Sequence, residues 1–240
     1  MARFAAIQFH PEHSAPAQNR AHLEDLLDRA GSMGANLAVA PEMAITGYVW
    51  PDADAIRPYC EPGQGPTHEV VARACRRHGM WAVVGFAESA PDGLYNSAMV
   101  VDGDGALRAV YRKNLLFELD TTWATPGQDR VIVDTPWGRV APAICMDLND
   151  DRFTRWLNRE RPDIVAFCTN WVDQGVDILP YWRARLYGWR GWFVAADAWG
   201  LDSGVRMYGR SAILGPRGRL VALAEAEGDA VLLGEVDVDE

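Results

Sequence analysis

Three residues whose side chains could act together in a reaction each follow a strand-like run of this 240-residue chain. They are Cys145 after residues 139–144, Glu42 after residues 36–40 and Lys113 after residues 107–111. In open α/β sheets, ligands bind outside the carboxyl ends of the strands. We therefore expect a thiol, a carboxylate and an ammonium group to face one common cleft.

These three groups suit acyl transfer through a thioester. A cysteine is a strong nucleophile only as a thiolate, which a neighbouring cation such as Lys113 favours. Lys113 could also stabilise the oxyanion formed when Cys145 attacks a carbonyl, and the backbone N–H of Met146 is a second candidate donor. Glu42 could take the thiol proton, return it to a departing amine and then activate water.

The other cysteines have structural interpretations. Cys168 also ends an apolar run, but it lacks the acidic turn that follows Cys145. Cys75 lies on the apolar face of an expected helix and Cys60 in a loop, so we interpret all three as structural. Four cysteines without a C-x-x-C pair do not indicate a disulfide framework, and we expect a reducing, cytoplasmic compartment. The five histidines show no metal-ligand spacing.

Composition limits the partners. The formal net charge is −10, and phosphate binding needs a basic face, so nucleic acid is not an expected partner. No apolar run approaches the length of a membrane span. Residues 1–8 are typical of a first strand rather than a signal peptide. We expect one domain over residues 1–240, with a small molecule as substrate and no membrane contact.

Apolar periodicity and Gly/Pro turns predict an α/β protein in which helices alternate with strands and hairpins also occur. Helices are expected at residues 23–33, at 67–78 with Thr67 as cap and Gly79 as stop, from 153 onward, and at about 181–191. Strands are expected at residues 3–9, 36–40, 81–86, 97–101, 106–111, 131–134, 139–144, 164–167, 193–196, 211–214 and 220–224. About a dozen strands would strain one open sheet, which favours two packed mixed sheets with outer helices. Pro142 predicts an irregularity within its strand.

Three spaced motifs follow one another along the chain: Pro41-Glu42 with Thr46-Gly47-Tyr48, then Tyr111-Arg112-Lys113, then Ile144-Cys145-Met146-Asp147. They resemble the signatures of the nitrilase superfamily, the carbon–nitrogen hydrolases. Residues 5–8, 125–127, 184–185, 194–196 and 215–218 are also similar to family segments. The resemblance therefore covers nearly the whole chain.

The resemblance implies a four-layer αββα sandwich that pairs into an eight-layer homodimer, and it implies neither metal nor organic cofactor. It makes Glu42 the general base and acid, Lys113 the oxyanion stabiliser and Cys145 the nucleophile. Family members often carry a second glutamate after the lysine, and Glu118 and Asp120 compete for that role here.

Three loops are expected to set specificity, at residues 48–50, 116–123 and 170–172. Tyr48, Asn170 and Trp171 are the candidate substrate contacts within them. The tryptophan-rich segment between residues 171 and 199 could line an aromatic pocket, but packing in the core or in a dimer interface is the favoured interpretation. Its members are Trp171, Trp182, Trp189, Trp192 and Trp199.

The expected function is hydrolysis of the C–N bond of a small carboxamide through a Cys145 acyl-enzyme, with release of ammonia or an amine. The segment 144–149 is also similar to the signature of amidases that act on N-terminal Asn or Gln of peptides. Asp147, Asp150 or Asp151 could then bind the peptide's α-ammonium group, although acids near a helix start are commonly caps.

Other functions remain open. Hydrolysis of a nitrile or an N-carbamoyl compound would use the same residues. An inactive binding or scaffold protein is a second class, which the presence of Glu42, Lys113 and Cys145 together disfavours. A third alternative is a cysteine–histidine hydrolase in which His10 orients the cysteine.

Overall fold

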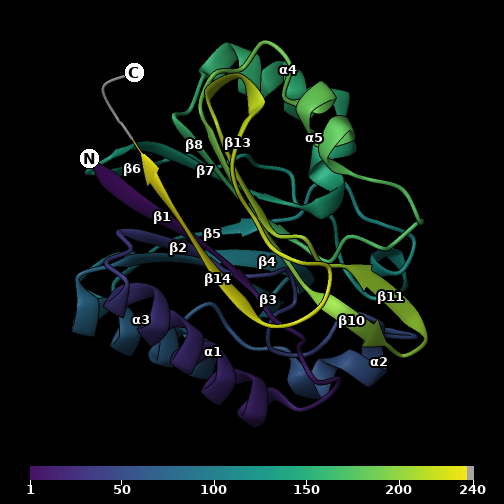
Figure 1. Cartoon of the computed structure of the whole chain (residues 1–240). Coiled ribbons are helices and arrows are strands. Elements are labelled where there is room, and N and C mark those ends of the chain that lie inside the picture. The colour runs from purple at the N-terminus through teal and green to yellow at the C-terminus, as the bar shows by residue number, and fades with distance from the viewer. Residues whose placement is uncertain (237–240) are drawn as a thin grey trace.

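Two six-stranded sheets form the middle of the computed structural model, which describes residues 1–236 (Figure 1). The first runs in the order β14 (Ala230–Val236), β1 (Ala2–Gln8), β2 (Leu37–Val39), β3 (Trp81–Ala90), β4 (Gly93–Val101), β5 (Leu107–Arg112). The second runs β13 (Arg219–Leu223), β12 (Ala212–Gly215), β9 (Trp192–Asp197), β8 (Ile164–Thr169), β7 (Gly138–Ile144), β6 (Val133–Thr135).

Helices cover the outer face of each sheet (Figure 1). The first sheet carries α1 (Pro16–Ser32) and α3 (Pro66–His78), and the second carries α4 (Asp151–Glu160) and α5 (Leu179–Arg185). A short helix, α2 (Ala53–Ile56), and a hairpin of β10 (Trp199–Asp202) and β11 (Val205–Tyr208) lie at one end. Short 3-10 helices span Arg57–Tyr59, Asp120–Thr122, Cys145–Asn149 and Pro216–Gly218. This confirms the αββα sandwich predicted from the sequence.

Both sheets are mixed, as expected. In the first, β1, β2 and β3 are parallel, whereas β4, β5 and β14 are added antiparallel. In the second, β7, β8 and β9 are parallel and β6 and β12 are antiparallel. The parallel strands therefore bring the residues that follow β2, β7 and β8 toward one end of the sandwich.

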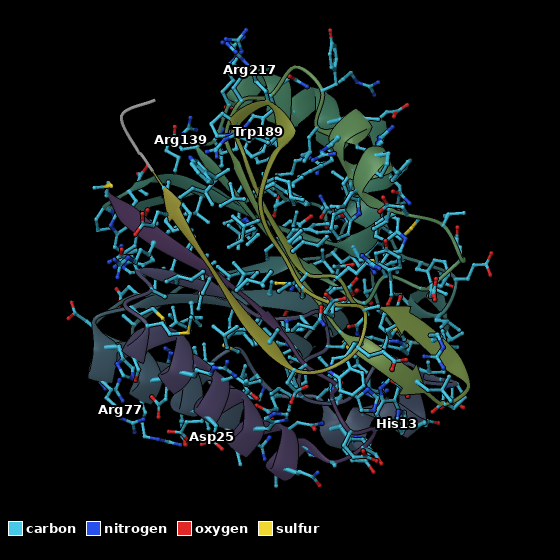
Figure 2. All side chains as sticks on the ribbon, in the orientation of Figure 1. His13, Asp25, Arg77, Arg139, Trp189 and Arg217 are labelled. Atoms are coloured by element: carbon cyan, nitrogen blue, oxygen red, sulfur yellow. The ribbon has the colours of Figure 1, made fainter. Side chains whose placement is uncertain are left out.

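Apolar side chains fill the space between the layers (Figure 2). The three-and-four spacing of Leu23, Leu26, Leu27 and Ala30 buries one stripe of α1 against the first sheet. Charged residues such as Asp25 and Arg77 point outward from α1 and α3 (Figure 2). Within residues 1–236, no helix is both long enough and apolar enough to cross a membrane.

Most of the tryptophan-rich segment belongs to the core. Trp182 is fully buried, and its ring meets the rings of Phe167 and Phe193 edge-on at centroid distances of 5.8 and 5.6 Å. Trp189 and Trp192 are also buried. Trp171 differs, because it borders a cavity described below.

Several sequence predictions about local structure were wrong. Thr67 does not cap α3: Gly65 is the cap residue, and the Glu61 carboxylate accepts the Thr67 N–H at 2.8 Å. The last helix ends at Arg185 rather than near residue 191, because the chain turns at Gly188, whose φ is +91°.

Pro142 causes no register shift between β7 and β8. It lies beyond the residues that pair with β6, where the loss of an N–H donor is tolerated. The sequence interpretation also missed α2, β10, β11 and β14.

Candidate active site

Glu42 is held against the first sheet by its backbone neighbours. The chain leaves β2 and stays beside β3, where Ala40 N–H donates to Val83 O at 2.9 Å and Gly85 N–H donates to Pro41 O at 3.1 Å. A Cβ atom at Gly85 would lie 2.5 Å from the Cα of Glu42, so only glycine permits this approach. The Glu42 side chain is fully buried.

Lys113 follows β5, and backbone hydrogen bonds hold its main chain in place as they do that of Glu42. Its N–H donates to Asn96 O, and its carbonyl accepts the Gly127 N–H, both at 2.8 Å. Lys113 is the only lysine among the 240 residues, and its side chain is completely buried. A buried ammonium group requires partners of opposite charge.

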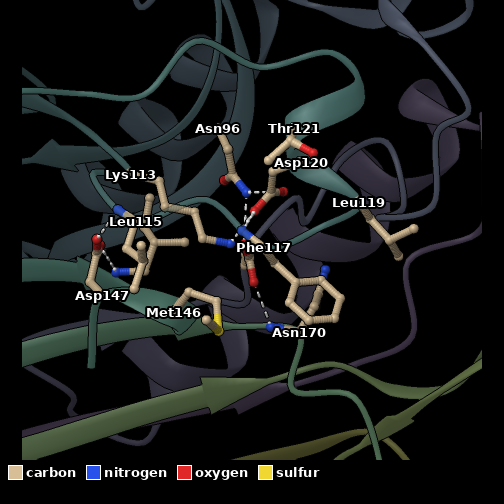
Figure 3. Close-up of polar contacts among 12 residues, drawn as sticks. Asn96, Lys113, Leu115, Phe117, Leu119, Asp120, Thr121, Met146, Asp147 and Asn170 are labelled. Atoms are coloured by element: carbon tan, nitrogen blue, oxygen red, sulfur yellow. Dashed lines mark hydrogen bonds and ion pairs between the residues drawn. The ribbon is translucent and has the colours of Figure 1, made fainter. Parts of the chain in front are cut away.

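Two carboxylates are the partners of the Lys113 ammonium group (Figure 3). Lys113 Nζ lies 2.6 Å from Glu42 Oε1 and 2.5 Å from Asp120 Oδ2. Asn96 Nδ2 donates to both acids, at 2.7 Å to Glu42 and 3.1 Å to Asp120. All four side chains are 0 % exposed. We call Glu42, Asn96, Lys113 and Asp120 the buried charge cluster.

The structure separates the two candidates for the second acid. Asp120 belongs to the charge cluster and also accepts the Phe117 N–H at 2.9 Å. Glu118 is exposed, and within residues 1–236 its carboxylate makes no hydrogen bond to the cluster. Asn96 was missed because it lies inside an apolar strand. The sequence signal that could have identified it is a single amide side chain within the mostly apolar run of residues 93–101.

Cys145 begins the turn after β7. Its φ is +39°, a left-handed conformation that is strained for a residue with a Cβ and that clusters at functional sites. Ile144 pairs with Cys168 of β8, which brings Cys145 beside Thr169 and Asn170. The backbone N–H of Asn170 in turn donates to Glu42 Oε2 at 2.8 Å. Asn170 therefore connects the turn at Cys145 to the buried charge cluster.

Asp147 ties this turn to the segment that follows Lys113 (Figure 3). Its carboxylate accepts hydrogen bonds from Tyr111 Oη (2.7 Å), Ile144 N (2.9 Å), Asn114 N (3.0 Å) and Leu115 N (3.1 Å). All four hydrogen bonds come from groups within the protein, so Asp147 holds the turn at Cys145 against the loop that follows Lys113. It is not a free acid that could bind an α-ammonium group.

The other two proposed ammonium ligands are also engaged elsewhere. Asp150 caps α4 by accepting the Arg152 N–H at 2.8 Å. Asp151 forms an ion pair with Arg185 at 2.8 Å. Each of the three aspartates therefore already has a partner within the protein.

Burial is the largest influence on the pKa values of the site. Burial raises the pKa of the Cys145 thiol well above its ordinary value, the Glu42 charge raises it further, and the opposing effect of Lys113 is smaller. Burial also raises the pKa of Glu42. Burial alone would lower the pKa of Lys113, but attraction to Asp120 and Glu42 raises it well above its usual range. Lys113 lowers the pKa of the Cys145 thiol, as the sequence hypothesis expects, but by less than burial and the Glu42 charge raise it.

The thiol borders a small cavity of about 50 Å³. Its walls come from all three loops that were expected to set specificity, and they include Tyr48, Phe117, Met146, Asn170 and Trp171. Lys113 Nζ lies 5.7 Å from the centre of the Tyr48 ring. Cys145 thus lines the cavity, and Tyr48 lies between the cavity and Lys113 of the buried charge cluster.

A buried aspartate holds the Tyr48 loop in place. Asp202 Oδ2, in the β10–β11 hairpin, accepts the N–H groups of Tyr48 at 2.5 Å and Val49 at 3.2 Å. Its Oδ1 faces His13 Nδ1 at 3.0 Å. This contact spans more than 150 residues of sequence, and no local pattern indicated it.

The alternative residues lie elsewhere. His10 Nδ1 is 2.8 Å from the backbone oxygen of Trp199 and does not orient a cysteine. Cys75 and Cys168 are fully buried, and burial raises the pKa of Cys75 to about 12. Cys60 is half-buried against Ile56 O, with its pKa also raised to about 12. Of the four thiols, Cys145 is the one that borders the cavity.

This difference predicts selective alkylation. We expect a stoichiometric amount of iodoacetamide to label Cys145 before Cys60, Cys75 and Cys168, because only Cys145 combines an access route with a neighbouring base. Peptide mass spectrometry over time measures the order. Cys145→Ser is the control, in which early labelling should disappear. Labelling of Cys168 or Cys60 first would contradict the assignment.

Comparisons with known proteins agree with this geometry. The family model for carbon–nitrogen hydrolases matches residues 3–240, and the chain belongs to this family, whose members hydrolyse carbon–nitrogen bonds. It is 28 % identical over 244 residues to a nitrilase of Pyrococcus abyssi, an alignment covering 99 % of this chain and 90 % of the relative. It is 26 % identical over 287 residues to a protein N-terminal amidase of Schizosaccharomyces pombe, covering 98 % and 99 %.

The fold also has solved counterparts. An amidase variant from Nesterenkonia sp. AN1, described with acrylamide added to its active-site cysteine, matches with a TM-score of 0.86 at 19 % identity. The match covers 99 % of this chain and 94 % of that one. The nitrilase-superfamily membership and the fold predicted from the sequence are thus confirmed.

Proposed function

We propose that this hydrolase is a thiol amidase that cleaves the C–N bond of small carboxamides, with Cys145 as nucleophile. The observation that carries the proposal is the position of Cys145 at a small cavity beside a fully buried Glu42–Lys113 ion pair. Buried, paired charges next to a strained nucleophile are typical of a pre-organised catalytic site.

In the acylation step, Cys145 Sγ attacks the amide carbonyl carbon while Glu42 takes the thiol proton. A base is required because the pKa of the buried thiol is raised. Lys113 Nζ and the backbone N–H of Met146 stabilise the oxyanion. Glu42 then gives its proton to the amide nitrogen, the C–N bond breaks, ammonia or an amine leaves, and a thioester remains on Cys145.

In the deacylation step, Glu42 takes a proton from water, and the oxygen attacks the thioester carbon. The second oxyanion is held by the same donors. When it collapses, the C–S bond breaks, the thiolate regains the proton from Glu42, and the carboxylic acid is released. The cycle returns Cys145 and Glu42 to their starting protonation states.

Asp120 is proposed as the positioning residue that keeps Lys113 charged and in place. Asp120→Asn should lower kcat/KM by about tenfold to a hundredfold, less than the roughly 10²–10³-fold cost of deleting an oxyanion donor. Charge repulsion from Asp120 contributes to the raised pKa of Glu42. The acid limb of the kcat/KM profile, where the base becomes protonated, should therefore move to lower pH. An unmoved or upward-shifted limb would contradict this role.

A second candidate function is deamidation of N-terminal Asn or Gln. The similarity to the protein N-terminal amidase and the segment 144–149 favour it. The engagement of Asp147, Asp150 and Asp151 in structural contacts speaks against it. Nitrile and N-carbamoyl hydrolysis remain alternatives within the same chemistry.

An ammonia-release panel tests these alternatives. It compares short primary amides, nitriles, N-carbamoyl amines and peptides with N-terminal Asn or Gln, each with Cys145→Ala as the blank. The proposal expects the highest kcat/KM with short amides. Faster release from N-terminal peptides or nitriles would replace it with the corresponding alternative.

Assembly and location stay predictions. The expected homodimer or higher homo-oligomer follows from the family resemblance, and the cytoplasmic compartment follows from the cysteine pattern. Light scattering of the purified chain and fractionation of the source cells would test them.

A further inference from the structure

Two buried polar groups on residues that line the cavity have no protein partner. The Tyr48 hydroxyl and the Asn170 side-chain oxygen are both buried, each residue being 2 % exposed, and neither forms a hydrogen bond with residues 1–236. Buried polar groups are nearly always hydrogen-bonded, and an unsatisfied one costs roughly 1–3 kcal/mol. Both residues border the same cavity as Cys145. Two such groups beside the nucleophile indicate contacts reserved for a ligand.

The backbone N–H groups of Tyr48 and Asn170 already have acceptors within the protein. The Asn170 N–H donates to Glu42, and the Tyr48 N–H donates to Asp202. Each side chain is therefore presented from a fixed main-chain position, while its own polar atoms remain available. Such pre-positioned groups discriminate strongly between ligands that can and cannot hydrogen-bond to them.

The walls of the cavity carry no formal charge near neutral pH. They consist of Tyr48, Phe117, Cys145, Met146, Asn149, Asn170, Trp171, Val172 and Gln174. The charges beyond them, those of Glu42, Lys113 and Asp120, already pair with one another. A substrate carboxylate or ammonium group beside the reacting carbon would lose its hydration without gaining a counter-ion on these walls.

The size of the cavity narrows the substrate further. About 10–15 Å³ is enough for one water molecule, and the cavity measures about 50 Å³. That space suits a carboxamide group with a short chain. Phe117, Met146 and Trp171 provide apolar contact for such a chain.

We infer that the Tyr48 hydroxyl and the Asn170 side-chain amide recognise the –CONH₂ group of a short, uncharged primary amide. The inference rests on the proposed thiol amidase function. The NH₂ group has two N–H donors, one for Asn170 Oδ1 and one for the Tyr48 oxygen, which leaves the carbonyl oxygen for Lys113 and Met146. A secondary amide offers one N–H, and an ester or a nitrile offers none.

The test compares an amide and an ester that give the same acyl-enzyme. Propionamide and p-nitrophenyl propionate both form a propionyl thioester on Cys145, but only the amide has N–H donors. In Tyr48→Phe and Asn170→Leu, kcat/KM for propionamide should fall about 10–100-fold, the factor expected from a lost buried hydrogen bond. The ester's kcat/KM should change by less than about threefold. Tyr187→Phe, at a position that is 87 % exposed, is the matched tyrosine control.

An equal loss for amide and ester would overturn the inference, because it would mean that the two residues act through Glu42 or the loop structure. An unchanged amide rate would overturn it as well. Ester turnover that depends on Cys145 without any amide turnover would also count against it. If Cys145→Ala left both rates intact, the proposed function itself would fail.

Alkylation of Cys145 provides a readout that needs no turnover. Iodoacetamide carries a –CONH₂ group and iodoacetate a carboxylate of nearly the same shape. In each case the sulfur displaces iodide to form a C–S bond. The ratio of the iodoacetamide rate to the iodoacetate rate at Cys145 of the unmodified chain should exceed the same ratio for a free thiol by at least about tenfold. Asn170→Leu should reduce this ratio. Equal relative rates, or a preference that the substitution leaves unchanged, would reject the assignment of Asn170.

Discussion

Cys145→Ala is expected to abolish turnover and leave the fold intact. Loss of a catalytic nucleophile lowers kcat by about 10⁶-fold in other hydrolases whose residues act as a unit. Cys145 already borders a cavity, so loss of its sulfur adds little void to the packed core. The thermal unfolding midpoint should therefore change by only a few degrees. Ammonia release and differential scanning fluorimetry measure the two effects.

Cys168→Ala is the matched control. Cys168 is fully buried between the sheets and belongs to the apolar core, so its substitution should lower stability while activity is retained. Retention of even a modest rate in Cys145→Ala, or loss of activity only in Cys168→Ala, would show that the nucleophile has been misassigned.

Lys113→Met is expected to lower both activity and stability. Turnover should fall by several orders of magnitude, because the oxyanion loses its cation and Glu42 loses its partner. Two carboxylates would also remain buried without an ammonium group. Breaking a buried ion pair in this way costs about 3–5 kcal/mol of the free energy of unfolding.

The stability loss should depend on pH. Unpaired buried carboxyls have raised pKa values in the folded state, so the folded form binds protons more tightly than the unfolded form and loses stability as pH rises. The deficit of Lys113→Met should thus be smaller in acid than at neutral pH. Chemical denaturation at several pH values would measure it. A deficit that grows on acidification would contradict the buried pairing.

The double variant Lys113→Met/Asp120→Asn separates the two effects. Replacing one carboxylate by a neutral amide should recover part of the lost stability, but it does not restore a cation for the oxyanion. Recovery of activity along with stability would mean that Lys113 only supports the fold.

The strand-end residues Glu42, Lys113 and Cys145 were predictable because local sequence determines where a strand stops. The two mixed sheets were predictable from the same apolar runs and from the Gly/Pro turns between them. Asn96 and Asp202 were not predictable, because their contacts depend on how strands far apart in sequence face each other. The contacts of Asp147 were not predictable for a related reason. The sequence left open whether it binds an α-ammonium group or caps a helix start, whereas its carboxylate also accepts hydrogen bonds from the segment after Lys113.

Strand β14 illustrates the same limit in the fold. It pairs with β1 across more than 220 residues, so its place at the sheet edge depends on a partner that no local window contains. The raised pKa of Cys145 could not be anticipated either. It depends first on the burial of the thiol and then on the charge of Glu42, which is distant in the sequence.

The most direct test of the account is to trap the acyl group on the sulfur. In Glu42→Gln, the carboxylate charge that raises the pKa of the Cys145 thiol is gone, so the thiol can lose its proton to solvent slowly. The thiolate can then be acylated by p-nitrophenyl propionate, whose leaving group needs no proton, whereas water is no longer activated for deacylation. Mass spectrometry of the digested protein should then find a propionyl group on the peptide that contains Cys145, released by hydroxylamine as expected of a thioester. A propionyl group on another residue, or none while the unmodified chain still hydrolyses the ester, would contradict the central claim.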